Sequence, residues 1–488
     1  MTRSILETDG YKFSMQDAGW PLREETFVYF HRSGGPQIVP FNIGRRVMQL
    51  WPEASNEDYE FLAKNEYEMG IGFKSVFSRQ RQIELTIRSI PPFSIFYPGE
   101  PVFTVTGPSA LVSWFEPLVL QLSWQIQLGT LALTDREGLA RELQVVTCHK
   151  QKEIALEILD AVGIKAPPIA VDDSGYCAKV FLAAEKLLEV VKNPDRIFEV
   201  GLRSASCMAQ HDIVIQALKE HGIRRTSDVA SAKRWGMIPV GTMGHEHTQR
   251  YRSDEMAFRA MKDRRPYRSS FLTDTYDPYQ SGIPAAVRVM MENPTAHDSM
   301  RYDSANKRTE YVFAVALSKE KGLEPGHIIE SELDLAETAS FEGLRMSLGI
   351  AENRQFYGYG KYFVSDTAPG FLTRDRVSAV YKLAQTGPWP TMKFSEHKES
   401  IPGRPVAFRR TSAAGAIGIV GQEGEKCPDG YALLTDEADS PEKISTDVGR
   451  QLAAAAHADN AHAVPSIATR AVIDQVRRDR ERIRNERI

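Results

Sequence analysis

The sequence predicts an α/β fold in which parallel strands and helices alternate around a barrel. Between about residues 144 and 366, short apolar runs alternate with amphipathic helical segments, a pattern typical of parallel strands joined by right-handed helical crossovers. A short polar or glycine-containing segment, called a tip below, follows most of these runs. In a β/α barrel such tips gather at one end and build the functional site, so chemistry is expected there.

The segments outside residues 144–366 have different residue patterns. Residues 25–34 and 82–107 carry β-branched and aromatic residues between Pro and Gly breakers, which predicts strands and turns. Residues 111–133 follow as a buried helix or pair of helices. The basic and acidic residues of 471–488 alternate, which favours a solvated helix over a nucleic-acid-binding arm.

Composition narrows the class of protein. The 488 residues are 42% hydrophobic and 25% charged, which indicates a globular protein of two or three domains. A net charge of -4 argues against a nucleic-acid partner. The four cysteines form no CxxC pair, so a zinc ribbon is not expected and a reducing compartment is favoured.

No membrane segment is expected either. The most apolar stretch, residues 110–134, is broken by Glu116, Pro117 and three glutamines, and a span needs roughly 18–20 apolar residues. The first residues have no apolar core of the signal-peptide type. A cytoplasmic protein is therefore predicted.

The stretch GTMGHEHTQRY, residues 241–251, holds two histidines. On a helix His245 and His247 would point about 200° apart and could not share a metal, and the HExxH pattern is absent. Two interpretations stay open at this stage. The stretch is a polar helix start with Glu246 favoured by the helix dipole, or Thr242 and His245 face a site in which the imidazole acts as nucleophile or base.

Other tips offer groups that bind anions and hydroxyls. Arg301 and Asp303 lie two apart in SMRYDSAN, so on a strand they face the same side. They form either a simple ion pair or a site for a substrate with an anion and sugar hydroxyls. A further arginine, Arg203, follows the run in EVGLRS.

A glycine-containing tip adds a candidate phosphate site. FYGYGK places Gly358 and Gly360 before Lys361, and backbone amides without side chains can cradle phosphate. Together the tips indicate an anionic ligand with several phosphates.

The order of these motifs resembles that of the nicotinate phosphoribosyltransferase family over roughly residues 8–404. TDGYKFSM is similar to the family's opening TDxYxxTM, and GTMGHE to its GTxxHE element. The other elements follow in the family's order: EVGLRSASCMAQH, TSDVASAKRWG, MRYDSAN, IIESELD, FYGYGKYFVSD and YKLAQTGPWPTMKFSEHKESIPGR.

The resemblance implies an activity. The family joins nicotinate to 5-phosphoribosyl 1-pyrophosphate, which yields nicotinate mononucleotide and pyrophosphate in NAD salvage. It couples this step to ATP hydrolysis through a phosphorylated histidine, which corresponds to His245, and His247 is expected to be peripheral. Mg²⁺ is expected with ATP and phosphoribosyl pyrophosphate, and no protein metal site is predicted.

The resemblance also implies an architecture. An irregular α/β barrel, residues 141–375, is expected beside an α+β domain made of residues 1–140 and completed by residues 376–488. A homodimer with shared active sites is expected, in which Tyr11 reaches the partner's site. The predicted substrate-binding residues are Tyr11, Arg203, Ser227, Thr242, Arg301, Asp303, Ser331, Gly358, Gly360 and Lys361.

The chain departs from the family's pattern at several positions. An aromatic residue is replaced by Val200, which removes one stacking wall for the pyridine. The other departures are Ser204, Asn306, Glu332 and Lys361. They bear on base specificity and on ATP coupling.

Base specificity depends on one polar position. Nicotinamide-specific relatives carry an acid where this chain has Ser227, and an acid there would repel the nicotinate carboxylate. Ser227 therefore favours nicotinate, whereas an alignment shifted by one residue would place Asp228 there. A nicotinamide phosphoribosyltransferase and a catalytically silent nucleotide-binding barrel are the alternatives.

Overall fold

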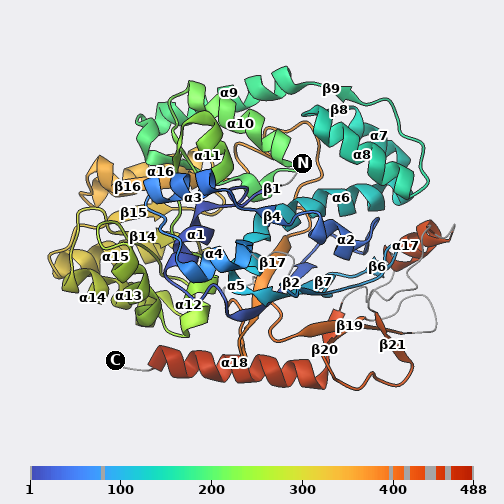
Figure 1. The fold of residues 1–488 in the computed structure, drawn as a ribbon. Helices are drawn as coiled ribbons and strands as arrows, with labels where there is room; N and C mark the ends of the chain where they lie inside the picture. The colour runs from blue at the N-terminus through green and yellow to red at the C-terminus, as the bar shows by residue number, and fades with distance from the viewer. Residues whose placement is uncertain are drawn as a thin grey trace.

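The structure is a computed structural model that describes residues 3–78, 83–394, 399–410, 418–434, 444, 447–456 and 463–485. It confirms the predicted fold class, because a parallel α/β barrel packs beside a five-stranded antiparallel sheet to which segments before and after the barrel contribute (Figure 1). The SEHK tetrapeptide of the last motif, residues 395–398, lies outside the described residues.

Seven parallel strands form the barrel sheet, in the order β12-β11-β10-β16-β15-β14-β13. Because β12 and β13 follow each other in the chain yet form the two edges of this sheet, the barrel is open between them. The strands are β10 (Ile197–Glu199), β11 (Arg225–Thr226), β12 (Ile238–Pro239), β13 (Ser270–Leu272), β14 (Ser299–Tyr302), β15 (Gly326–Ile329) and β16 (Gln355–Tyr359).

Amphipathic helices lead into the first of these strands and connect the others. Helix α9 (Asp173–Val191) shows why they form, since its buried residues recur every three or four positions, at Tyr176, Val180, Ala184 and Leu187. The others are α10 (Met208–Glu220), α11 (Val229–Trp235), α12 (His245–Tyr251), α13 (Asp254–Arg264), α14 (Ile283–Glu292), α15 (Lys307–Glu320) and α16 (Leu335–Ser347).

Two details differ from the sequence-based interpretation. The apolar run before α9 forms β9 (Ala170–Val171), which pairs with β8 (Val145–Val146) in a separate small sheet, so the barrel sheet begins only at β10. Strand β13 was not predicted. It is three residues long, as is the predicted strand β10, so its length does not explain why it was missed.

A five-stranded sheet in the order β18-β17-β2-β7-β5 joins distant parts of the chain. Strand β17 (Ala379–Thr386) pairs antiparallel with β2 (Glu24–His31), which shows that a segment after the barrel completes the N-terminal sheet. The boundaries at 140 and 375 themselves stay predictions. The remaining strands are β5 (Thr86–Ser89), β7 (Phe103–Pro108) and β18 (Trp389–Pro390).

The sequence predicted one buried helix or a pair over residues 111–133, and the structure shows a pair, α5 (Ser109–Trp114) and α6 (Glu116–Thr134). No helix within the described ranges is long and apolar enough to cross a membrane. The other N-terminal elements are β1 (Arg3–Ser4), α1 (Gly10–Asp17), β3 (Gln37–Ile38), α2 (Ile43–Met48), β4 (Pro52–Glu53), α3 (Asn56–Lys64), α4 (Ile71–Ser78), β6 (Ile95–Phe96), α7 (Arg136–Leu143) and α8 (His149–Ala161).

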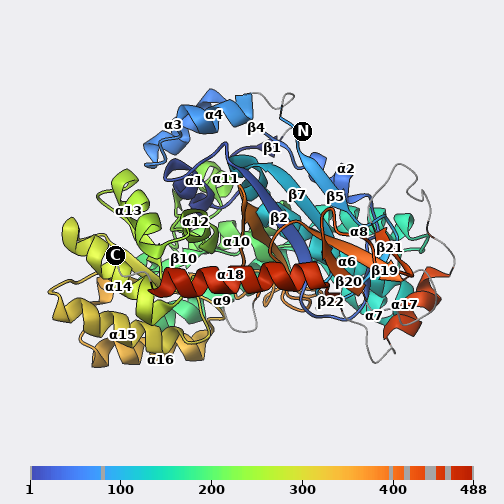
Figure 2. The ribbon, with the colours of Figure 1, turned by 90° about the horizontal axis from the view of Figure 1, so that it is seen from below.

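The chain ends in a long helix, α18 (Ile467–Asn485), which lies along the outside of the molecule in both views (Figures 1 and 2). The predicted solvated helix is confirmed, since the fully buried residues of α18 are only Thr469, Val476 and Ile483 in its described part. Before it come β19 (Pro405–Arg410), β20 (Gly418–Gln422), β21 (Tyr431–Leu434), α17 (Val448–Ala456) and β22 (Ala463–Pro465).

Candidate active site

The carboxyl ends of the barrel strands face the α+β layer, and two adjoining pockets lie there. One is lined by His245, Asp303, Lys382 and Lys393, and is called the histidine pocket below. The other is lined by Phe198, Val200, Ser227 and Thr242, among others, and is called the ring pocket. Tyr11, Arg203 and Arg301 line both, so the two pockets form one continuous site.

Seven of the predicted site residues meet in this site. They are Tyr11, Arg203, Ser227, Thr242, His245, Arg301 and Asp303. Six of them come from the ends of four barrel strands and the loops after them, which were expected to converge. Only the approach of Tyr11, on α1, could not be inferred from the alternation of strands and helices.

His245 is the first residue of α12, at the opening between β12 and β13. Its Nδ1 shares a hydrogen bond of 3.2 Å with Thr275 Oγ1. Its Nε2 lies 3.9 Å from an Asp274 oxygen and 3.8 Å from an Asp303 oxygen, and has no hydrogen-bond partner among the described residues. Burial, helped by the positive charge of Lys393, holds the pKa of His245 well below its usual range. The imidazole is therefore neutral at physiological pH, as a nucleophile must be.

The two carboxylates beside His245 titrate differently. Burial raises the pKa of Asp274 to about 6, although Lys393 acts in the opposite direction. Burial would also raise the pKa of Asp303, but the positive charges of Lys393 and Arg301 outweigh it and hold this pKa below its usual range. Asp303 is therefore negatively charged at neutral pH. No other described residue donates a hydrogen bond to either oxygen of Asp274.

Asp274 was missed by the sequence analysis. It lies two residues after β13, the strand that was also missed. The signal was present as an apolar run followed by polar residues in SSFLTDT.

Arg301 joins the two pockets. One Nη donates to Thr242 Oγ1 at 3.0 Å and to the Met243 carbonyl at 2.8 Å. The other lies 3.4 Å from Asp303, as the same-side spacing predicted, and Nε lies 3.1 Å from Glu330. The guanidinium is therefore held at the wall of the ring pocket by groups on three strand ends.

The ring pocket resolves the question of Ser227 or Asp228. Ser227 lines it, and its hydroxyl donates to Asp9 at 2.6 Å. Asp228 points away and lies 3.0 Å from the buried imidazole of His211. An acid nevertheless reaches the pocket from the N-terminal segment, because Asp9 lines it, and burial raises the pKa of Asp9 to about 6.

The predicted loss of an aromatic wall at Val200 is partly offset. Val200 lines the ring pocket, but so do Phe198, two residues earlier on β10, and Tyr11. Two aromatic side chains are therefore available to contact a planar ring.

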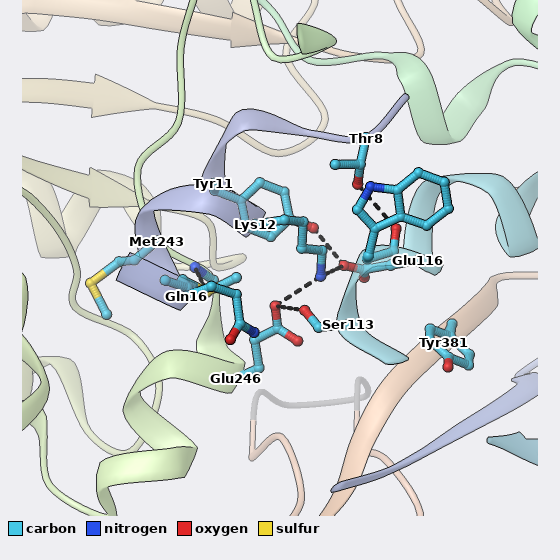
Figure 3. A network of polar contacts seen from close by, with 12 residues as sticks. Thr8, Tyr11, Lys12, Gln16, Ser113, Glu116, Met243, Glu246 and Tyr381 are labelled. Atoms are coloured by element: carbon cyan, nitrogen blue, oxygen red, sulfur yellow. Dashed lines mark hydrogen bonds and ion pairs between the residues drawn. The ribbon is translucent and has the colours of Figure 1, made fainter. Parts of the chain in front are cut away.

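A buried ionic network supports the site (Figure 3). Lys12 donates to Glu116 at 2.6 Å and to Glu246 at 2.8 Å, and Ser113 donates to the same Glu246 oxygen at 2.9 Å. The Tyr11 hydroxyl donates to Glu116. In the sequence, Glu116 stands out only as a break in an apolar stretch, and Lys12 only as a member of the TDGYKFSM motif. Charged residues so far apart in sequence give no sign of pairing.

Four predicted site residues do not line either pocket: Ser331, Gly358, Gly360 and Lys361. At this tip it is Glu330 that lines the ring pocket. A Cβ on Gly358 would lie 2.6 Å from Glu330 Cγ, so this glycine provides space for that side chain. Whether Gly360 and Lys361 contact phosphate stays a prediction, and so does the role of Ser331, whose φ is +66°.

The placement of Tyr11 corrects an expectation. Tyr11 was predicted to reach a partner's site, but it lines the pocket that contains His245 of its own chain. Gly10 and Gly241 make this possible, since a Cβ on Gly241 would lie 2.3 Å from the Gly10 carbonyl carbon, so the two backbones pack directly on each other. Tyr11 therefore no longer argues for a site shared between subunits.

No family model matches the chain. A nicotinate phosphoribosyltransferase of Bacillus subtilis is 27% identical over 234 residues, which cover 46% of this chain and 43% of that protein. One of Mycobacterium tuberculosis is 27% identical over 210 residues, which cover 40% of this chain and 42% of that protein. The matched region thus spans less than half the length of these relatives.

Solved structures match more of the chain. A nicotinate phosphoribosyltransferase of Porphyromonas gingivalis has a TM-score of 0.56 at 18% identity and covers 81% of this chain and 95% of its own. One of Vibrio cholerae has a TM-score of 0.55 at 17% identity, with 82% and 90% covered. The chain therefore has the fold of the nicotinate phosphoribosyltransferases, the family that its sequence relatives and its structural neighbours both name.

Proposed function

We propose that the protein is a nicotinate phosphoribosyltransferase that forms nicotinate mononucleotide and pyrophosphate and is coupled to ATP hydrolysis. The observation that carries the proposal is the environment of His245. A neutral, buried imidazole with an unpaired Nε2 among the described residues lies between two aspartates and faces Lys393. The unpaired nitrogen is available to attack a phosphorus atom or to bond to a bound phosphate, and the variant His245→Asn separates these two roles.

The two pockets suit the two halves of the transfer reaction. The ring pocket takes the pyridine between its aromatic walls. The histidine pocket takes phosphoribosyl pyrophosphate, with Asp303 accepting from ribose hydroxyls and Arg203, Lys382 and Lys393 facing the phosphates. The pyridine nitrogen attacks the anomeric carbon, the bond from this carbon to the pyrophosphate oxygen breaks, and pyrophosphate leaves with the electron pair.

The charges in the ring pocket favour nicotinate over nicotinamide. Arg203 and Arg301 remain charged, because neighbouring carboxylates more than compensate for the burial that would lower their pKa values. Burial raises the pKa values of Asp9 and Glu330. These two carboxyls therefore lose their negative charge more readily than the arginines lose their positive charge. The balance stabilises an anionic ring substituent.

ATP coupling and Mg²⁺ belong to the same proposal. His245 Nε2 would attack the γ-phosphorus of ATP, the bond to the ADP oxygen would break, and water would later release the phosphate. Asp274 and Asp303 would help to hold Mg²⁺, which neutralises phosphate charge when bound. Two observations support this. Both side chains end in a carboxylate, and in the described part of the chain no other residue donates a hydrogen bond to the Asp274 oxygens.

We propose a cytoplasmic location for this activity. The four cysteines are all unbridged in the structure, which suits a reducing compartment. A homodimer stays a prediction.

The proposal is tested by measuring phosphoribosyl transfer to nicotinate and to nicotinamide at equal concentrations, with and without ATP and Mg²⁺. The expected result is faster turnover of nicotinate and stimulation by ATP. Preference for nicotinamide would identify the alternative enzyme. Phosphoribosyl pyrophosphate that binds without any transfer would instead identify a catalytically silent barrel.

A second experiment follows from the position of Tyr11. The variants Tyr11→Ala and His245→Ala are each expected to be inactive, and mixing them is expected to restore no transfer activity, because no chain then carries both residues. Subunit exchange must be demonstrated with differently tagged chains. Recovered activity would show that Tyr11 acts in a partner's site.

A further inference from the structure

We propose that the C-terminal helix α18 positions the histidine pocket through Arg477, Asp479 and Arg480. These residues lie on the outside of the protein and do not line the pocket. Each contacts a segment that carries a pocket residue close by in sequence. The inference rests on the proposed function for its kinetic consequence, but not for its structural one.

Arg480 makes the central contact. Its Nε and Nη2 donate to the Tyr276 carbonyl at 3.0 and 2.7 Å. Tyr276 directly follows Thr275, the hydrogen-bond partner of His245, and Asp274 precedes both. Two donors on one carbonyl restrain the backbone from which both site residues project.

The same guanidinium covers a second segment. It lies 4.8 Å from the centre of the Phe394 ring, which is itself 6.2 Å from the ring of Tyr276. The residue before Phe394 is Lys393. Among the cations of the pocket, Lys393 lowers the pKa of Asp303 the most. Arg480 therefore links the loop after β13 to the segment that carries Lys393.

Asp479 and Arg477 extend the contact to two further segments. Asp479 accepts a 2.9 Å hydrogen bond from Arg252, the residue that ends α12 in the left-handed conformation, with φ +55°. Because α12 is only seven residues long and begins at His245, restraint at one end orients the other. Arg477 lies 3.3 Å from Glu399, which precedes the pocket residue Ser400.

Each of the four contacted segments carries a neighbouring residue that lines the histidine pocket or bonds to His245. Among the described residues, α18 makes no hydrogen bond or ion pair with a residue that lines only the ring pocket. A loosened α18 should therefore weaken phosphoribosyl pyrophosphate binding and ATP coupling while leaving nicotinate binding intact. A helix that contributed only general stability would affect both substrates alike.

The test compares Arg480→Ala with Arg478→Ala in the full chain. Arg478 is exposed, lies on the same helix and makes none of these contacts, so its replacement matches the change in charge and helix propensity. Arg480→Lys is a third variant, which keeps the charge but loses the paired donors.

Two readouts are expected to separate the variants. Amide hydrogen exchange in peptides covering 245–252 and 270–277, measured without substrates, should become faster in Arg480→Ala only. The KM for phosphoribosyl pyrophosphate should rise about 10-fold or more, the effect of losing a hydrogen bond to a charged group, with an unchanged KM for nicotinate. Arg480→Lys should lie between wild type and Arg480→Ala.

Equal exchange in Arg480→Ala and Arg478→Ala would overturn the proposal, as would equal increases of both KM values. If the wild-type enzyme showed no phosphoribosyl transfer, the proposed function would fail. Hydrogen exchange would then decide alone whether α18 positions these segments.

Discussion

Replacing His245 with asparagine is expected to abolish the ATP hydrolysis that accompanies nucleotide formation, while slow, uncoupled phosphoribosyl transfer persists. Asparagine still donates a hydrogen bond but cannot form a phosphoryl bond to a ring nitrogen. ADP and nicotinate mononucleotide are measured in the same reaction. ATP hydrolysis that stays linked to transfer in His245→Asn would rule out a nucleophilic role.

The pH dependence of the wild-type reaction gives independent evidence. Burial holds the pKa of His245 well below 6.5, so the imidazole remains neutral, and able to attack, as pH falls through 6.5. The ATP-coupled rate should therefore not decline with the pKa of an ordinary histidine. A rate that halves near pH 6.5 because of His245 protonation would contradict this assignment.

The covalent intermediate can also be detected directly. Enzyme incubated with γ-labelled ATP should carry acid-labile, base-stable phosphate on the peptide that contains His245. His245→Asn is the matched control. Label on a different peptide, in enzyme that couples ATP hydrolysis to transfer, would move the phosphorylation site elsewhere.

Replacing Lys12 with methionine is expected to produce the largest loss of stability, about 3–5 kcal/mol, the usual effect of removing one partner of a buried ion pair. Lys12 is 2% exposed and is paired with both Glu116 and Glu246. Its loss leaves two buried carboxylates without their shared cation. The free energy of unfolding is measured by denaturant titration.

Lys382→Met is the matched control for this experiment. Lys382 also pairs with Glu116, at 3.1 Å, but its side chain is 29% exposed, so water can replace part of the interaction. The loss of stability should be clearly smaller. Equal losses would show that the buried network does not depend on Lys12.

The pH dependence of the network has a defined sign. Although burial disfavours its charge, Glu116 and Glu246 raise the pKa of Lys12, so its contribution is complete below its unfolded pKa, about 10.4, and is lost as pH rises through the folded pKa. Although burial opposes it too, Lys12 lowers the pKa of Glu116, so that contribution is present above about 4.3 and is lost as pH falls through the folded pKa. Wild type and Lys12→Met should therefore differ most between these limits.

The sequence by itself predicted the fold class and seven residues that line the two pockets, of which Tyr11 and Ser227 came only from the family resemblance. Apolar runs, polar tips and amphipathic helices are local patterns, and the parallel barrel follows from them because crossover connections are right-handed. Residues such as Thr242, His245, Arg301 and Asp303 were found because each lies at the end of a strand or just after it, and parallel strands bring their carboxyl ends to one edge.

Only the tertiary structure decided which distant groups act on one another. Asp9 enters the ring pocket because two glycines let the N-terminal backbone pack against the end of β12, and the burial that raises its pKa cannot be read from its neighbours in sequence. Lys12, Glu116 and Glu246 pair across three helices, and Arg480 reaches Tyr276 from the far end of the chain. Such pairings depend on distances in space, because desolvation and Coulomb interactions act between groups that are close in the fold, whatever their separation along the chain.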